Sequence, residues 1–151
     1  MSDSQRGVVE TPDPVMSHFV AYYPDRERSM AVARGLVEGG AKYLEIQFPF
    51  SDPSADGPPI QRACQAAIDR GFTLEKGWAF LKDLTEHTQV PVFLMTYAAI
   101  AVSHGVTDFV RRAADCGARG LIVPDLPVDQ DEGILAACDH WGIAFVPVFP
   151  V

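Results

Sequence analysis

The sequence predicts an α/β fold with a parallel sheet, and it favours part of a (β/α)-barrel over a doubly wound sheet. Short apolar runs alternate with amphipathic segments along the chain, which is typical of βα units. The apolar runs are nearly continuous, as expected for parallel strands covered on both faces. No GxGxxG or GxxxxGK motif follows any strand, which argues against a nucleotide-binding sheet.

The first predicted elements are a strand over 17–23 ("SHFVAYY") and a helix over 25–40. Asp25 is placed to cap this helix, and Gly39-Gly40 is placed to end it. The apolar stripe of the helix consists of Met30, Val32, Ala33, Leu36 and Val37. The second strand is expected over 42–48 ("KYLEIQF").

The rest of the chain continues the alternation. Helices are expected over 60–71, 73–88, 106–117 and 130–142, and the remaining strands over 91–97, 119–125 and 143–150. Polar residues lie in or just after the strands: Glu45 and Asp56, Thr96 and Tyr97, and Asp125. Barrels carry their chemistry at the carboxyl ends of the strands, so this distribution favours the barrel.

Composition bounds the class of protein. A chain of 151 residues suits one domain, and a hydrophobic share of 48% indicates a globular one, expected over 13–151 after a flexible tail over 1–12. The net charge of −8 argues against nucleic acid and anionic membranes as partners. The cysteines show no CxxC spacing, which argues against a metal site and indicates reduced core thiols in a cytoplasmic protein.

The stretch "EIQFPFSDPSADGPP" places three acids, Glu45, Asp52 and Asp56, in and just after the second strand. Alternation turns Glu45 away from both of its neighbours, Leu44 and Ile46, and in a closed barrel that direction is the interior. Glu45 is then either a structural acid paired with a base or a carboxyl of raised pKa suited to acid–base chemistry. The inner face is expected to include Phe19, Ile46, Phe48, Phe93, Met95 and Ile122.

These residues also carry a family resemblance. "LEIQFPFSDPSADGPPIQRA" resembles the signature of the tryptophan synthase α subunit family, which is an acid followed by PFSDP-x-ADGP-x-IQ. The similarity extends over nearly the whole chain, through "HFVAYYPD", "PVFLMTYAAI", "ADCGARGLIVPDLPVDQ" and "GIAFVPVFPV". The resemblance implies a (β/α)8 TIM barrel, of which this sequence contains the first five strands with their helices.

The resemblance implies a lyase of tryptophan biosynthesis that cleaves indole-3-glycerol phosphate to indole and glyceraldehyde 3-phosphate. Glu45 matches the catalytic glutamate of the family, and Asp56 matches its catalytic aspartate. This retro-aldol reaction needs a proton delivered to indole C3 and a proton removed from the glycerol hydroxyl beside the breaking bond. Glu45 is suited to both transfers, and Asp56 to stabilising positive charge on the indole nitrogen.

Other roles follow from the same resemblance. Substrate binding is implied for Tyr97, Asp125 and His18, although core packing or turn formation would also explain each of them. Pro49, Asp52 and Pro53 match the loop that meets the β subunit, which uses pyridoxal phosphate, in an α2β2 heterotetramer. The chain itself shows no pyridoxal-phosphate site, so we expect it to need no cofactor and no metal. The sequence departs from the family at four positions, His18, Tyr22, Gln47 and Ala99. At one of them, Gln47 stands in place of a common glycine.

The sequence stops in the fifth expected strand, before the loops that hold phosphate in such barrels. We therefore expect the 151-residue chain alone to be inactive, whether it is a fragment or a genuine truncated product. Two alternatives stay open besides the lyase: a non-catalytic half-barrel interaction module, and a related barrel lyase or isomerase with another phosphorylated substrate.

Overall fold

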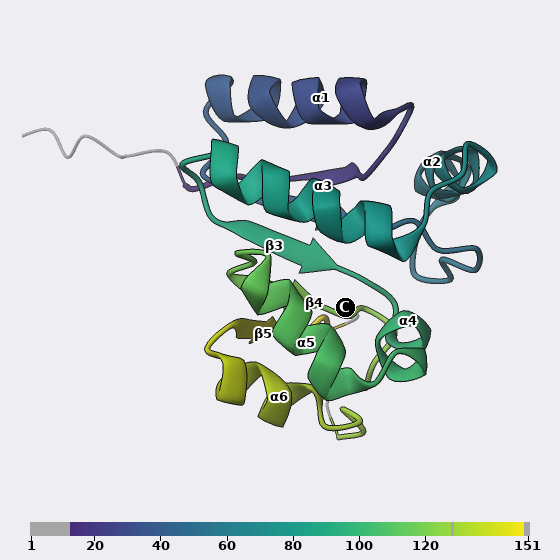
Figure 1. Cartoon of the computed structure of the whole chain (residues 1–151), viewed down its shortest axis with the longest axis vertical. Coiled ribbons are helices and arrows are strands. Elements are labelled where there is room, and N and C mark those ends of the chain that lie inside the picture. Colours follow the sequence, from purple (N-terminus) through teal and green to yellow (C-terminus); the bar gives the residue numbers. More distant parts are fainter. Residues whose placement is uncertain (1–12, 128, 150–151) are drawn as a thin grey trace, which may run out of the picture.

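A computed structural model describes residues 13–127 and 129–149, and it contains one parallel five-stranded sheet. The strands are β1 (Met16–Val20), β2 (Tyr43–Gln47), β3 (Val92–Met95), β4 (Gly120–Ile122) and β5 (Ala144–Val146) (Figure 1). Their order in the sheet is the order in the chain. In a doubly wound sheet the strand order reverses partway across the sheet, whereas in a barrel each strand lies beside the next one in the chain. The barrel-type winding predicted from the sequence is therefore confirmed.

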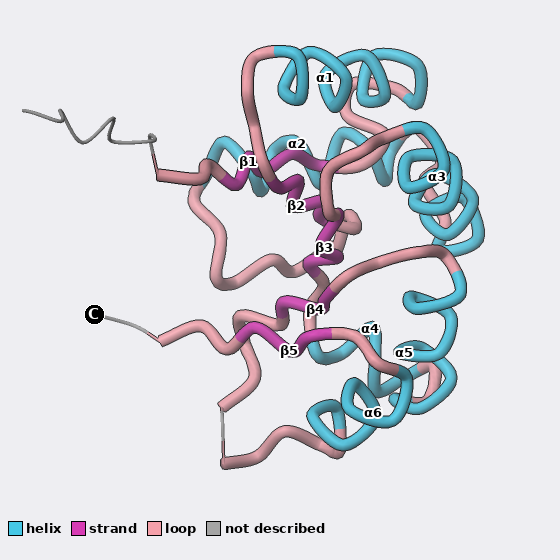
Figure 2. The backbone as a smooth tube through the Cα atoms, turned by 90° about the vertical axis from the view of Figure 1, so that its left-hand side faces the viewer, coloured by secondary structure: helices cyan, strands magenta, loops and turns pink. Residues whose placement is uncertain are grey.

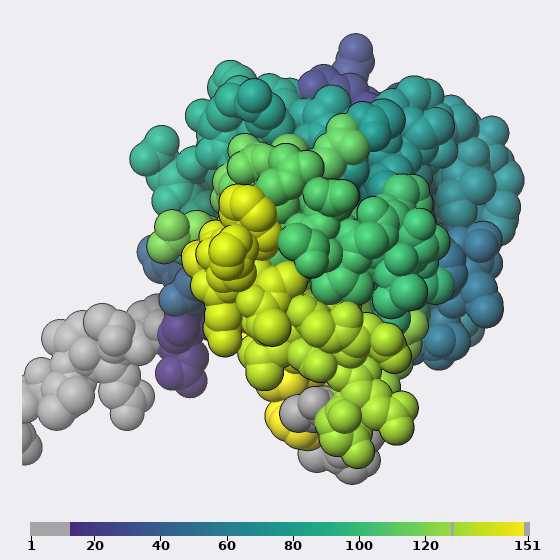
Figure 3. Space-filling view, turned by 60° about the horizontal axis from the view of Figure 1, so that its bottom comes forward, coloured from purple at the N-terminus to yellow at the C-terminus, as the bar shows by residue number. Residues whose placement is uncertain are grey.

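The helices that follow the strands lie mainly on one side of the curved sheet. They are α1 (Arg26–Glu38), α2 (Pro58–Asp69), α3 (Leu74–His87), α4 (Ala98–Ser103), α5 (Val106–Asp115) and α6 (Ile134–Trp141). Figure 2 shows α1, α3, α5 and α6 together on the convex side, which is where same-handed crossovers place them. In the space-filling view α5 and α6 lie side by side on this surface (Figure 3).

The elements differ from the sequence prediction in several places, among them the start of α2 at Pro58 and of α6 at Ile134. The strands are shorter than expected, and β1 ends at Val20 because the chain turns at Tyr22, which has a positive φ of 61°. Helix α4 was not predicted, because its sequence "AAIAVS" is too short to show helical periodicity. The predicted N-cap is confirmed, since Asp25 accepts a hydrogen bond from the Arg28 amide at 2.8 Å. The predicted tail over 1–12 and the last predicted strand residue, 150, lie outside the described residues.

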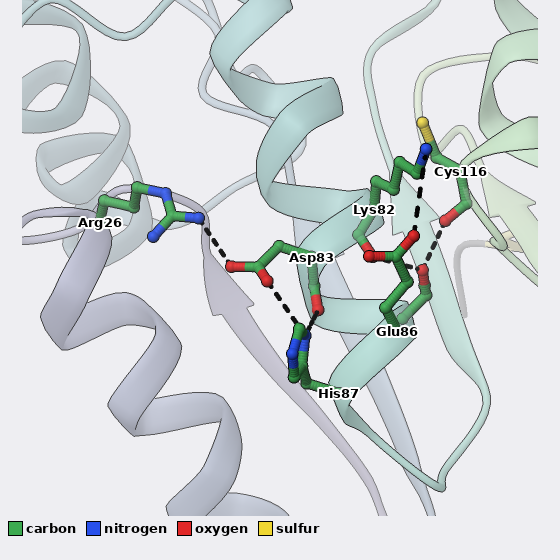
Figure 4. A network of polar contacts seen from close by, with 7 residues as sticks. Arg26, Lys82, Asp83, Glu86, His87 and Cys116 are labelled. Carbon is green, nitrogen blue, oxygen red and sulfur yellow. Dashed lines mark hydrogen bonds and ion pairs between the residues drawn. The ribbon is translucent and has the colours of Figure 1, made fainter.

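Two networks fasten neighbouring helices to one another (Figure 4). Arg26 of α1 reaches Asp83 of α3 at 2.6 Å, and His87 Nδ1 lies 3.0 Å from the same carboxylate. Farther along α3, the Thr85 hydroxyl donates to the Cys116 carbonyl at the end of α5, at 2.6 Å. These contacts are exposed or half-buried, so they orient the helices more than they stabilise them.

The expected inner face is partly wrong. Phe19, Ile46 and Phe48 point to the helices, where they join the main core, and only Phe93, Met95 and Ile122 line the opposite face. The reason is the alternation that turns Glu45 inward: residues one or three positions from it must point outward. Parallel register places His18 beside Glu45 and Val20 beside Gln47 on the inner face.

Gly120 makes room for an aromatic ring on that inner face. It is the register partner of Phe93, and a Cβ added to it would lie 2.6 Å from two atoms of the Phe93 ring. The same Cβ would lie 2.9 Å from the Ala144 carbonyl oxygen of β5. Neither approach is tolerated without moving the ring and the strand, so glycine is required by space here.

We expect Gly120→Ala to destabilise the chain by about 1–3 kcal/mol, the usual scale for overpacking a core. Gly35→Ala is the matched control, because nothing lies within 4 Å of its added Cβ in α1 and alanine favours a helix. The control should gain about 0.5–1 kcal/mol. Urea unfolding of both variants tests this, and equal stability of Gly120→Ala and the parent would contradict the packing account.

Candidate active site

Three polar side chains occupy neighbouring positions on the inner face. His18 of β1 and Glu45 of β2 are register partners, and Gln47 lies two residues beyond Glu45 on the same side of β2. Gln47 is fully buried, whereas His18 and Glu45 are half-buried. The direction predicted for Glu45 from alternation therefore agrees with its surroundings in the sheet.

The loop after β2 brings Asp56 to this group. Asp56 Oδ2 accepts hydrogen bonds from Gln47 Nε2 and from the Tyr97 hydroxyl, both at 2.7 Å. The Tyr97 hydroxyl in turn accepts from the Ala55 amide at 3.1 Å, and its ring stacks on Phe50 with centroids 5.2 Å apart. The loop is thus fastened to the carboxyl ends of β2 and β3, close enough for the charge of Asp56 to act on the pKa of Glu45.

The surroundings of Glu45 favour the protonated form of its carboxyl. Burial raises the pKa of its carboxyl above the ordinary 4.5, the charge of His18 lowers it, and the charge of Asp56 raises it. Since an acid–base catalyst works best when its pKa is near the working pH, these influences favour proton transfer over a purely structural role. The structural alternative required a paired base, and within the described part of the chain Glu45 forms no ion pair.

The three residues expected to bind substrate occupy different settings. His18 lies beside Glu45, and its Nε2 is 2.8 Å from Gln47 Oε1. Tyr97 is fully buried, and burial followed by its bond to Asp56 raises the pKa of its hydroxyl, which therefore stays protonated. Asp125 is exposed, and its Oδ1 accepts from the Ala98 amide at the start of α4 at 2.9 Å. A role in substrate binding stays a prediction for all three.

The residues expected to meet a partner lie in the same loop, between β2 and α2. Asp52 is exposed, whereas Pro49 and Pro53 are buried. Asp52 lines an open hollow of about 480 Å³ whose other walls include Arg62 and Gln65 of α2. Pro53 lines the same hollow, but of the three residues only Asp52 is exposed.

Gln47 is the residue whose part in the site was not predicted. Its sequence signal was its parity with Glu45, because residues two apart on a strand share a face. The partners that hold it lie 29 and 9 residues away, and no local pattern identifies them.

Other site types receive no support from the part of the chain that the structure describes. It contains no group of three or more His, Cys, Asp or Glu placed to hold a metal ion. None of its helices combines the length and the apolar character needed to cross a membrane. The three cysteines, Cys64, Cys116 and Cys138, are buried and free.

Comparison with known proteins identifies the family. The family model described as "Tryptophan synthase alpha chain" matches residues 10–151. The chain is 41% identical over 138 residues to the tryptophan synthase alpha chain of Helicobacter hepaticus, covering 85% of this chain and 52% of that one. The corresponding protein of Methanosarcina acetivorans is 37% identical, with 87% and 48% covered. The chain thus spans about half the length of the curated relatives it matches.

Solved structures agree with the sequence comparisons. Tryptophan synthase from M. tuberculosis superimposes with a TM-score of 0.84 at 32% identity, covering 90% of this chain and 54% of that one. A mutant tryptophan synthase alpha-subunit from Pyrococcus furiosus gives 0.83 at 31%, covering 89% and 55%.

The buried acid gives a prediction on pH and stability. Because the pKa of Glu45 is raised on folding, its contribution to stability is present below its unfolded pKa and is lost as pH rises through the folded pKa. Glu45→Gln should therefore melt above the parent at pH 7–8, and the difference should shrink toward about pH 4. Thermal unfolding across this range tests it, and a difference independent of pH would contradict the burial of an ionising group.

The hydrogen bonds between Tyr97 and the loop after β2 give a second prediction. Tyr97→Phe removes both hydrogen bonds of the hydroxyl, so we expect a loss of about 1–3 kcal/mol and faster hydrogen exchange at the Ala55 amide. Tyr43→Phe is the matched control, because within the described residues the Tyr43 hydroxyl forms no hydrogen bond. Hydrogen-exchange measurements on the two variants compare them directly. Unchanged protection of Ala55 in Tyr97→Phe would show that the loop is held by other contacts.

Proposed function

The chain belongs to the tryptophan synthase alpha chain family, and on that premise we propose that it provides the acid–base site for cleaving indole-3-glycerol phosphate. The products are indole and glyceraldehyde 3-phosphate. The observation that carries this proposal is the half-buried Glu45, whose pKa is raised and which shares the inner face with a fastened Asp56. A structural carboxylate would need a paired cation in this position, whereas a catalytic one needs an accessible proton.

Glu45 acts as acid and base in the proposed mechanism. In its protonated form it delivers a proton to indole C3, which turns the ring into a leaving group. The resulting carboxylate then takes the proton of the glycerol hydroxyl beside the bond that breaks. The electrons of that O–H bond form the aldehyde, the carbon–carbon pair returns to the ring, and Glu45 is protonated again for the next turnover.

Asp56 stabilises the positive charge that develops on the indole nitrogen when C3 is protonated. Gln47 and Tyr97 both donate to its Oδ2, so within the described residues its Oδ1 is left to accept from the indole N–H. An acceptor fixed before the charge develops stabilises the transition state without reorganising at that moment. Two carboxyls in different surroundings thus take two different roles.

We propose that residues 13–151 form the first five βα units of the barrel and that the phosphate is held elsewhere in it. The relatives extend to about twice the aligned length. The phosphate-binding loops of such barrels belong to the last βα units. We further propose a cytoplasmic protein that uses the loop carrying Asp52 to contact a tryptophan synthase β subunit in an α2β2 assembly. The exposure of Asp52 at the rim of an open hollow supports that contact.

The proposal predicts two inactive variants with intact folds. In a chain continued by the remaining part of the H. hepaticus relative, Glu45→Gln should lower indole release at least about a hundredfold, the scale of a lost acid–base group. Asp56→Asn should also remove most activity, while its side-chain oxygen still accepts from Gln47 and Tyr97 and keeps the loop in place. Steady-state indole release, with circular dichroism as the fold check, measures both.

The matched control is Glu38→Gln, an exposed carboxyl at the end of α1, which lies at the opposite end of the sheet from the site. It should leave indole release unchanged, and the 151-residue chain without the added part should release none. Turnover like the parent's in Glu45→Gln would remove Glu45 from the mechanism. An Asp56→Asn variant that lost its fold together with its activity would make Asp56 structural.

A further inference from the structure

Gln47 is a fully buried amide with three polar neighbours. Its Oε1 lies 2.8 Å from His18 Nε2, and its Nε2 lies 2.7 Å from Asp56 Oδ2 and 3.4 Å from Cys64 Sγ. It therefore connects β1, the loop after β2 and α2 through one side chain. A buried amide is stable only if its donors and acceptor are satisfied, and these contacts satisfy both ends.

The orientation of this amide follows from its partners. The Asp56 carboxylate only accepts, so the amide must present its NH2 group to Oδ2, and the reverse orientation would press two acceptors together at 2.7 Å. The carbonyl Oε1 is consequently the atom that faces His18. Since a carbonyl only accepts, His18 must carry a proton on Nε2.

From this chain of contacts we propose that Gln47 is a positioning residue that locks the Asp56 carboxylate and the Nε2–H form of His18, the register partner of Glu45. The catalytic consequence rests on the proposed lyase function, whereas the tautomer and the fastening of Asp56 do not.

The position of Gln47 gives it influence over the acid–base group without contact with substrate. His18 and Asp56 are the two neighbours whose charges act on the pKa of Glu45 in opposite directions. Gln47 holds one of them through its carbonyl and the other through its NH2 group.

The test uses the 151-residue chain labelled with ¹⁵N, because it needs no activity. Long-range ¹H–¹⁵N correlation at about pH 9, well above the ordinary imidazole range, reports which ring nitrogen carries the proton. We expect the parent to show His18 protonated on Nε2, with that proton protected from exchange. Gln47→Met keeps the length of the side chain but neither hydrogen bond, so the protected proton should disappear.

Gln47→Glu separates the two contacts. It keeps an acceptor for His18, so the protected Nε2 proton should remain, but it places a carboxylate against Asp56 and should speed hydrogen exchange at Ala55 at least tenfold. Gln89→Glu, which adds the same charge at an exposed position before β3, is the matched control and should change neither signal. If Gln47→Met fails to fold, the spectra of the parent and of Gln47→Glu still test the proposal.

The proposal is overturned if the parent shows His18 protonated on Nδ1 alone, or if the protected proton survives in Gln47→Met. Exchange at Ala55 that is unchanged in Gln47→Glu would overturn the fastening of Asp56. A failed indole-release assay would refute the lyase function and leave these spectra as they are, so the two failures can be told apart.

Discussion

The candidate site depends on one carboxylate oxygen, Asp56 Oδ2, which accepts from Gln47 on β2 and from Tyr97 at the end of β3. Hydrogen bonds to an ionised acceptor are stronger than neutral ones, and here they join a loop to two neighbouring strands. A loop residue thereby gains the positional precision of the sheet. The stacking of Phe50 on Tyr97 adds an apolar contact between the loop and the end of β3.

The same arrangement carries an energetic penalty that a purely structural protein would avoid. Glu45 is desolvated on a face where it forms no ion pair among the described residues, and the neighbouring charge of Asp56 adds to the rise of its pKa. Such a group destabilises the folded state whenever it ionises. Proteins commonly keep strained or destabilising groups where chemistry needs them, and the compact helix-facing core of Leu44, Ile46 and Phe48 offsets that penalty from the other side of the same strand.

Much of the fold and the direction of Glu45 could be predicted from the sequence, because both follow from local rules. The direction of Glu45 follows from alternation, and the start of α1 from the capping residue Asp25. The barrel-type winding was favoured over a doubly wound sheet by the polar residues at the strand ends and by the lack of a nucleotide-binding motif. The inner face was harder, since parallel strands are apolar on both faces and hydrophobicity does not distinguish Ile46 from Met95. Parity with Glu45 does distinguish them. Helix α4 and Gln47 escaped prediction because distant partners hold them, Asp125 for the first and His18 for the second.

The residues of the network come from neighbouring parts of one sheet. His18 lies on β1, Glu45 and Gln47 on β2, Asp56 on the loop that follows, and Tyr97 at the end of β3. These strands are paired directly in the order β1-β2-β3, so their register fixes the relative heights of the side chains. The geometry of this polar network is therefore set by three adjacent strands and the loop after β2. Groups elsewhere in a barrel that bind the rest of a substrate would only have to position the substrate beside these side chains.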